Sequence, residues 1–152
     1  MNIVLFEPEI HSNTGNIART CAITGARLHL IKPLGFSLDD KYLKRAGLDY
    51  WEYLDLSIYE NYIEFLEKNK DARLYFYSTK GEVSYTDKKY QEEDYLVFGP
   101  ETRGLPFDMM KTHWENVCKI PMGEKFRSLN LSNAVAIVLY EALRQGDFKG
   151  LK

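Results

Sequence analysis

Residues 2–31 read NIVLFEPEIHSNTGNIARTCAITGARLHLI, and this stretch decides the fold of the chain. Its first part, Asn2–Phe6, is a short apolar run of the kind that forms a buried strand. Asn13–Thr24 then spaces its small and apolar side chains as a helix does, and Gly25 is a suitable residue to end that helix. Because Arg27–Ile31 is a second strand-like run, the stretch predicts a β-α-β unit with parallel strands.

The same alternation continues along the rest of the chain. Further strands are expected at Tyr50–Leu54, Leu74–Tyr77, Tyr95–Phe98 and Val117–Ile120, and further helices at Asp39–Ala46, residues 58–69 and residues 131–143. No internal repeat, linker or low-complexity tract divides the 152 residues, of which 45% are hydrophobic. The sequence therefore predicts one α/β domain over residues 1–152, with a mostly parallel sheet and helices on both of its faces.

The last expected helix is apolar around much of its circumference. Asn130 or Ser132 could cap its first turn. One face of a sheet does not need so much apolar surface, so we expect the helix to pack against both the sheet and a second copy of the chain. Its apolar residues follow the helical i, i+3, i+4, i+7 spacing: Leu131, Ala134, Val135, Val138, Leu139, Ala142 and Leu143.

Composition narrows the classes of function. There is no run of 18 apolar residues, and the N-terminus passes directly into a strand-like run, so neither a membrane span nor a secretory signal is expected. Cys21 and Cys118 form no CxxC pair, which favours a cytosolic protein without disulfides. The net charge of −2 suits an RNA partner only if positive charge is concentrated locally. Lys41, Lys44 and Arg45 would share one helix face, although such groups are commonly just solvated surface.

Three segments hold more polar residues and glycines than a scaffold requires. The first is NTGNIAR at residues 13–19, at the turn from the first strand into the first helix. Parallel α/β proteins bind ligands at such turns, beyond the carboxyl ends of their strands. The alternative is a capped helix that carries an exposed arginine, and the pattern alone does not exclude it.

The second segment is FGPETRGLP at residues 98–106, directly after an expected strand. Gly99 lets backbone come close to a ligand without a Cβ in the way, and the two prolines stiffen the loop. The loop holds one acid and one base, Glu101 and Arg103. The alternative is therefore a rigid turn with a surface ion pair between these two side chains.

The third segment joins IPM at residues 120–122 to RSLNLSN at residues 127–133, again after an expected strand. Four small polar side chains precede or open the last helix: Ser128, Asn130, Ser132 and Asn133. Capping a helix needs one or two of them, so the others are candidates to bind a polar ligand at the helix N-terminus.

Several common catalytic and binding motifs are absent from the sequence. The chain contains no GxGxxG, no GxxxxGK[ST] and no GxSxG. His11, His29 and His113 are scattered and lack the spacing of metal ligands. A nucleotide-phosphate loop, an acyl-transfer serine and a metal site are therefore not expected.

Together and in this order, the three segments resemble the motifs of the SPOUT methyltransferases. Asn13–Arg19 is similar to their first motif, Phe98–Leu105 to the second, and Ile120–Met122 with Ser128–Val135 to the third. The resemblance covers nearly the whole chain. The small size and the opening NIVLFEPEI are similar to the minimal members, which 2′-O-methylate a cytidine or uridine at the anticodon wobble position of tRNA.

The resemblance implies a deep C-terminal trefoil knot, a homodimer, S-adenosylmethionine as methyl donor and tRNA as substrate. Tyr77 stands where such proteins often carry a smaller apolar residue, so its contact with the cofactor is by backbone or by side chain. The implied cofactor residues are Tyr77, Ser78, Thr79, Gly99, Glu101, Gly104, Ile120, Met122, Ser128, Leu129 and Asn133. The implied substrate residues are Asn13, Asn16, Arg19, Lys41, Arg45, Arg103 and Arg127.

Arg19 and Glu101 are the candidate catalytic residues. Methyl transfer is an in-line displacement that needs the ribose 2′-OH held close to the methyl group while its proton leaves. A free guanidinium is a poor base because its pKa exceeds ~12. We therefore expect Arg19 to hold the phosphate and stabilise the developing alkoxide, although related enzymes are thought to use this arginine as the base. Glu101 is the other candidate to accept the proton.

Two other functions stay open at this point. A SPOUT-like protein could bind RNA without catalysis, although Arg19, Glu101 and Ser128 are all present. A cofactor titration would decide that case. The chain could also be an unrelated parallel α/β nucleotide-binding enzyme, which the missing phosphate loops disfavour and which a structure without a knot would support.

Overall fold

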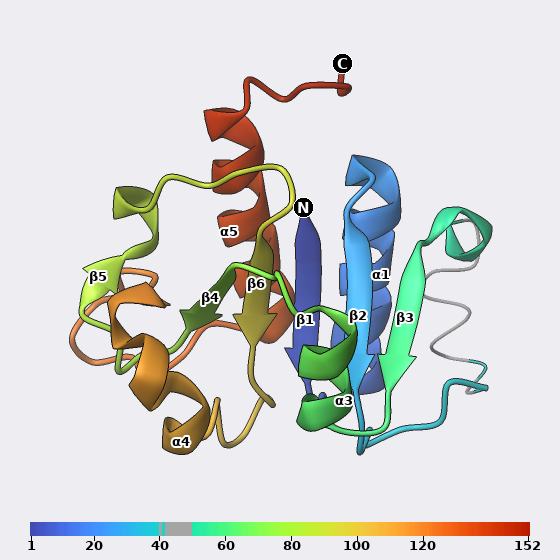
Figure 1. Cartoon of the computed structure of the whole chain (residues 1–152), viewed down its shortest axis with the longest axis horizontal. Coiled ribbons are helices and arrows are strands. Elements are labelled where there is room, and N and C mark those ends of the chain that lie inside the picture. Colours follow the sequence, from blue (N-terminus) through green and yellow to red (C-terminus); the bar gives the residue numbers. More distant parts are fainter. Residues whose placement is uncertain (40, 42–49) are drawn as a thin grey trace.

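Seven parallel strands form one sheet in a computed structural model that describes residues 1–39, 41 and 50–152 (Figure 1). Across the sheet their order is β3-β2-β1-β6-β4-β7-β5, and every neighbouring pair is parallel. The predicted α/β class with a parallel sheet is therefore confirmed. The strands are β1 (Asn2–Phe6), β2 (Arg27–Ile31), β3 (Leu56–Tyr59), β4 (Leu74–Tyr77), β5 (Val83–Ser84), β6 (Tyr95–Phe98) and β7 (Val117–Lys119).

The register brings several carboxyl ends of strands level with one another. Phe98 pairs with Leu5 on one side and with Tyr77 on the other, and Tyr77 also pairs with Cys118. Loops that leave β1, β4, β6 and β7 therefore start along one edge of the sheet. β6 returns between β1 and β4, and β7 returns between β4 and β5. This order is consistent with the expected trefoil knot, which itself stays a prediction.

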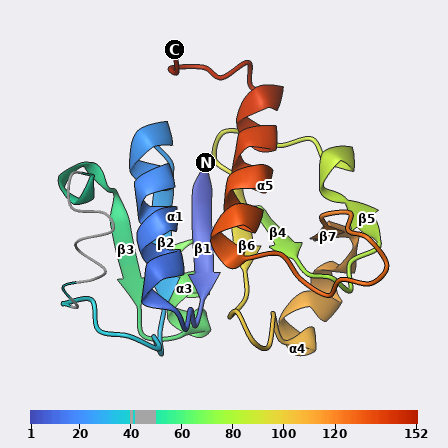
Figure 2. The ribbon, with the colours of Figure 1, turned by 180° about the vertical axis from the view of Figure 1, so that it is seen from behind.

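Helices cover both faces of the sheet. α1 (His11–Thr24) and α5 (Leu131–Gln145) lie side by side on one face, as Figure 2 shows, and α3 (Tyr62–Lys68) and α4 (Phe107–Met110) lie on the other. The described part of the chain contains no helix long and apolar enough to cross a membrane.

Two apolar cores hold these layers together. On the first face Ile17 of α1 and Val135 of α5 pack with side chains of β1, β2, β4 and β6. On the second face Phe65 and Met110 pack with the opposite side of the same strands. Because both faces of the central strands are covered, β1 is buried along its whole length.

The expected helix ends are confirmed in two places. Gly25 ends α1 in the left-handed conformation at φ 73°, and the Asn130 side chain caps α5. Asn61 caps α3 by accepting the backbone N–H of Glu64 at 2.9 Å, so this helix begins at Tyr62 and not at Ile58.

Other expectations about secondary structure are wrong or lie outside the described residues. The strand expected at Tyr50–Leu54 is instead a 3-10 turn, η1 (Trp51–Tyr53), and β3 begins afterwards because Leu56 can pair with Leu28 of β2. The short elements β5, α4, η2 (Tyr85–Asp87) and η3 (Lys111–Asn116) were not expected, since they are too short for a periodic pattern. The helix expected at Asp39–Ala46 lies outside the described residues, except for Asp39 and Lys41.

Candidate functional site

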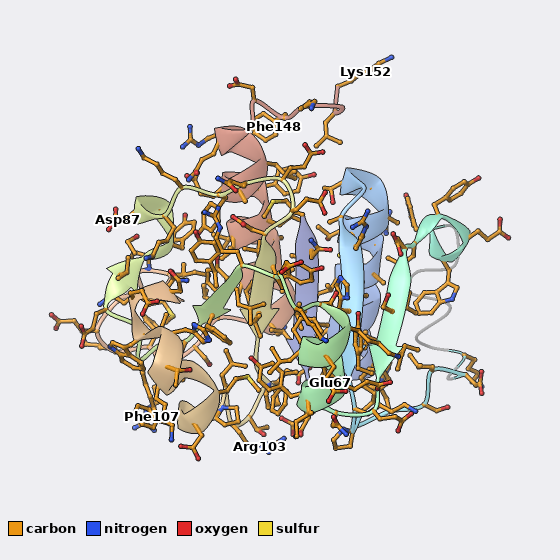
Figure 3. All side chains as sticks on the ribbon, viewed as in Figure 1. Glu67, Asp87, Arg103, Phe107, Phe148 and Lys152 are labelled. Carbon is orange, nitrogen blue, oxygen red and sulfur yellow. The ribbon has the colours of Figure 1, made fainter. Side chains whose placement is uncertain are left out.

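A cavity of about 620 Å³ lies at the carboxyl ends of β4, β6 and β7. Ligands of parallel α/β proteins bind at this edge of the sheet. Arg103, labelled at the lower edge in Figure 3, marks the loop that leaves β6. Five separate stretches supply the wall: Ile10 with Asn13, residues 77–80, residues 98–105, Ile120 with Met122, and residues 127–131 with Ala134. All three motif segments of the sequence therefore meet in one place.

The structure brings together nearly all of the expected cofactor residues. Asn133 is the exception, because it lies exposed in the first turn of α5 and outside the wall. The expected cofactor residues that line the cavity are Tyr77, Ser78, Thr79, Gly99, Glu101, Gly104, Ile120, Met122, Ser128 and Leu129. Their convergence supports the cofactor assignment, which remains a prediction for each residue.

The expected substrate residues divide into two groups. Asn13, Arg103 and Arg127 line the cavity. Asn16, Arg19 and Lys41 are exposed side chains outside the wall. Arg45 lies outside the described residues.

Glu101 links the loop after β6 to the start of α1. Its carboxylate accepts the backbone N–H groups of Glu9 at 2.8 Å and Ile10 at 3.0 Å, and the Asn13 side-chain amide at 3.2 Å. Both oxygens therefore accept hydrogen bonds from the loop after β1 and the start of α1. Since Ile10 precedes the first turn of α1 and has no side-chain cap of its own, the negative charge also suits the positive end of this helix.

The link between these two loops is reciprocal. The Glu9 carboxylate accepts both the backbone N–H of Thr102, at 3.1 Å, and its hydroxyl, at 2.7 Å. These hydrogen bonds to Thr102 lower the pKa of Glu9. Arg103 donates to the Glu7 carboxylate at 2.8 Å, so the structure does not pair it with Glu101 as the sequence alternative suggested. The acids that make these contacts, Glu7 and Glu9, were not among the predicted site residues. Their place directly after β1 is the feature of the sequence that could have identified them.

Gly99 is required by the loop itself. A Cβ at this position would lie 2.4 Å from the backbone nitrogen of Leu105 and 2.5 Å from the carbonyl carbon of Gly104, so the loop folds back onto it. Gly104 adopts φ +69°, a conformation that side chains other than glycine rarely take. The loop itself therefore requires glycine at position 99, and the predicted close approach of the Gly99 backbone to a ligand stays a prediction.

Asn13 joins the first and third motifs. Its side-chain oxygen accepts a hydrogen bond from the Asn130 amide at 3.0 Å, while its own amide donates to Glu101. The Asn130 oxygen accepts the backbone N–H groups of Ser132 and Asn133 at 2.9 and 3.3 Å, which caps α5. A continuous chain of hydrogen bonds thus runs from the loop after β6 through α1 to α5, and it fixes the mouth of the cavity.

The hydroxyl group of Tyr77 is hydrogen-bonded within the protein. The hydroxyl donates to the hydroxyl of Tyr90 at 3.0 Å, and Tyr90 in turn donates to the backbone carbonyl of Tyr85 at 2.6 Å. Burial raises the pKa of Tyr77 well above its ordinary value. The Tyr77 ring stacks on Phe98 at a centroid distance of 4.7 Å. A ligand in the cavity can therefore meet the backbone or the ring of Tyr77 while its hydroxyl stays bound to Tyr90.

Arg19 is held on the outer surface of α1. Its guanidinium carbon lies 4.7 Å from the centroid of the Tyr50 ring, and Nη2 donates to the Tyr50 hydroxyl at 3.3 Å. Asn13 lines the cavity six residues earlier, which is about 9 Å along the helix axis. Arg19 therefore lies near the cavity but outside its wall. A large substrate could contact Arg19 and the cavity at the same time.

The rim of the cavity carries a cation from outside the three motif segments. Lys80 lines the wall together with Arg103 and Arg127. Among the residues that the structure describes, no group of three or more His, Cys, Asp or Glu could hold a metal ion.

Comparison with known proteins identifies the family. Residues 1–140 match the SpoU rRNA Methylase family. The chain belongs to this family. The resemblance drawn from the three motifs is thereby confirmed, and the cavity described above is where these motifs meet.

Individual relatives and one solved structure cover almost the full chain. A tRNA (cytidine(34)-2′-O)-methyltransferase of Saccharophagus degradans is 54% identical over 99% of both chains. The protein of the same name from Escherichia coli K12 is 52% identical over 99% of this chain and 96% of its own. A solved structure concerned with the 2′-OH methylation of C/U34 on tRNA superposes with a TM-score of 0.91 at 48% identity, covering 96% of this chain and 95% of its own.

Proposed function

We propose that this SpoU-family chain transfers a methyl group from S-adenosylmethionine to the ribose 2′-OH of nucleotide 34 of a tRNA, a cytidine or a uridine. One observation carries this proposal: the three motifs of the sequence build a single cavity in a chain about half identical, over its full length, to cytidine(34) 2′-O-methyltransferases. The structure that concerns C/U34 extends the proposal to uridine.

The cavity suits a cofactor of this size. Its volume lies within the range of ordinary ligand sites, and its wall combines apolar side chains with backbone of three loops. Phe98, Leu105 and Leu131 provide apolar surface, and residues 77–80 and 99–104 would hold the polar parts. When bound there, S-adenosylmethionine supplies a methyl group on a sulfonium, which is ready for displacement by an oxygen nucleophile.

The residues of the chain then have separate tasks. Glu101 and Asn13 hold the loops of the cavity in register, since their polar atoms are engaged with each other and with the start of α1. Arg19 lies outside the wall, so it is free to meet the substrate and not the cofactor. We assign it the role of binding the phosphate and stabilising negative charge on the 2′ oxygen as the proton leaves. The same geometry makes Glu101 a positioning residue and a weaker candidate for the proton acceptor.

An RNA substrate is compatible with the small negative net charge. Lys80, Arg103 and Arg127 gather at the cavity, where phosphates of the substrate would lie. We propose a single domain that works in the cytoplasm as a homodimer. The exposed apolar side chains of α5, Ile137 and Tyr140, would be covered by the second copy.

Methylation of a tRNA transcript tests the proposal. The purified chain, S-adenosylmethionine and a transcript with C34 or U34 should give 2′-O-methylated nucleotide 34, detected by mass spectrometry of nuclease fragments. A transcript with 2′-deoxyribose at position 34 is the matched control and should accept no methyl group. Binding of the cofactor without methylation of any tRNA would instead support an RNA-binding protein that has lost catalysis.

A further inference from the structure

The turn Gly123–Phe126 stands on the rim of the cavity. Met122 and Arg127 on either side of it both belong to the cavity wall, so the residues between them lie at its edge. The backbone N–H of Phe126 donates to the carbonyl of Gly123 at 3.0 Å, which closes the turn. The turn therefore presents Phe126 at a defined place beside the cavity.

Phe126 is 75% exposed, and folding does not account for this position. Its ring lies beside Gly123, where a Cβ would come 3.5 Å from ring carbon Cδ2. It belongs to neither apolar core. Its neighbours in the chain, Lys125 and Arg127, are both exposed cations. An exposed aromatic ring between two cations is the combination by which proteins hold single-stranded RNA, since the ring stacks on a base while the cations meet phosphates.

We propose that Phe126 stacks on the base of the nucleotide next to the methylated one, with Lys125 and Arg127 on the neighbouring phosphates. The proposal rests on the proposed function, because it needs an RNA strand at the cavity. The ribose that receives the methyl group must reach the cavity, whereas the Phe126 ring lies outside its wall. We therefore assign the base that meets this ring to an adjacent nucleotide, with nucleotide 34 itself taken up at the cavity.

Substitutions that keep or remove the aromatic face test the stacking. Phe126→Leu keeps apolar volume and should weaken tRNA affinity roughly ten-fold, within a range of about five-fold to a hundred-fold. Phe126→Trp should retain the affinity of the parent. Cofactor affinity, measured by calorimetry, should change in neither variant because Phe126 lies outside the wall. Parental tRNA affinity in Phe126→Leu, or equal losses in Phe126→Leu and Phe126→Trp, would overturn the proposal.

Phe107→Leu is the matched control. Phe107 is also an exposed phenylalanine, at 59%, but it lies on α4, outside the cavity wall, and its neighbour Asp108 is paired with Lys111 (Figure 3). This variant should bind tRNA as the parent does. A loss as large as that of Phe126→Leu would show that any exposed apolar side chain matters here, and would overturn the proposed stacking.

A tRNA that lacks one base shows which base stacks on the Phe126 ring. In tRNA with an abasic nucleotide immediately before or after position 34, the effect of Phe126→Leu should vanish at one of the two sites. A full effect at both sites contradicts the proposal. Failure of the proposed function is seen separately, because the parent protein would then leave intact tRNA unmethylated, whatever residue stands at position 126.

Discussion

At the scale of single residues, Arg19 and Glu101 differ in what surrounds them. Arg19 lies over the half-buried ring of Tyr50 and donates a hydrogen bond to its hydroxyl group, which a phosphate could replace. Glu101 accepts three hydrogen bonds from groups of the same protein. Their substitution should therefore change different measurable quantities.

Arg19→Ala should lower the rate of methyl transfer by about 10²–10³ while leaving cofactor affinity nearly intact, because one stabilising donor is lost. Arg19→Lys should restore the rate only in part, since an ammonium group lacks the planar fork that suits phosphate. Single-turnover methylation of a tRNA transcript and calorimetry with the cofactor measure the two quantities. Tyr50→Phe is the control, because it keeps the ring beneath Arg19 and removes only the hydroxyl. A parental rate in Arg19→Ala at saturating tRNA would show that Arg19 is only a surface residue.

His29 is a buried histidine with a task in folding. Its Nε2 lies 3.1 Å from the Asn2 side-chain oxygen and its Nδ1 lies 2.9 Å from the Tyr59 hydroxyl. The Asn2 amide donates to the carbonyl of Glu93, so the Asn2 oxygen faces the ring and Nε2 carries the proton. Burial lowers the pKa of His29 to about 4 from 6.5, so the folded state favours the neutral ring.

Stability should accordingly depend on pH between about 6.5 and 4. As the pH falls through this window, the unfolded state binds a proton at His29 and the folded state does not, so the free energy of unfolding should fall by about 2–3 kcal/mol. Urea unfolding at several pH values measures this slope. His29→Gln should be less stable at pH 7 and should have a shallower slope below it. Equal slopes in parent and variant would assign the pH dependence to other groups.

At the scale of elements, the loop after β6 and the start of α1 form one unit. Glu101 joins them in one direction, and Glu9 with Glu7 joins them in the other. Asn13 extends the unit to the first turn of α5 through Asn130. Loss of one of these hydrogen bonds should therefore make the cavity wall less ordered at several places.

Glu101→Gln should weaken cofactor binding and lower the free energy of unfolding by about 1–3 kcal/mol. A glutamine turns one acceptor oxygen into an NH₂ donor, which would face either the backbone N–H of Glu9 or the backbone N–H of Ile10 together with the Asn13 amide. Calorimetry and urea unfolding measure the two effects. Glu67→Gln, on exposed α3 (Figure 3), is the control and should behave as the parent. If Glu101→Gln lost only turnover, with stability and cofactor affinity unchanged, Glu101 would be the proton acceptor after all.

At the scale of the whole molecule, one face carries apolar side chains that the fold leaves exposed. α1 and α5 pack against each other on this face (Figure 2). Ile137 and Tyr140 of α5 are 38% and 43% exposed, and Ile23 of α1 is 51% exposed. The expected apolar excess of the last helix is thus present on its outer side, where a second copy of the chain could cover it.

Sedimentation velocity at micromolar concentration should therefore show a dimer. Ile137→Asp should shift the chain toward monomer, because a carboxylate would be buried without a partner in the interface. Ile63→Asp is the control: Ile63 is 68% exposed on α3, which lies on the opposite face, and its substitution should leave the assembly unchanged. A monomeric parent, or a dimer that tolerates Ile137→Asp, would contradict this arrangement.

The local parts of this molecule could be predicted from the sequence alone. Apolar runs located β1, β2, β4 and β6 at their observed residues, and the ends of α1 and α5 followed from Gly25 and Asn130. These features depend on neighbours within a few positions, so periodicity and capping chemistry predict them. The second and third motifs begin at the ends of β6 and β7, as predicted, whereas the first motif, Asn13–Arg19, lies inside α1 and not at the turn before it.

Which of these parts meet became visible only in the folded chain. The partners of Glu101 lie 88 to 92 positions away, and Arg103 bonds Glu7 instead of the acid two residues before it. Tyr77 likewise bonds a tyrosine in another loop. These contacts follow from the register that sets β6 beside β1 and β4. No local pattern encodes that register, because it depends on how the two apolar cores pack on opposite faces of the sheet.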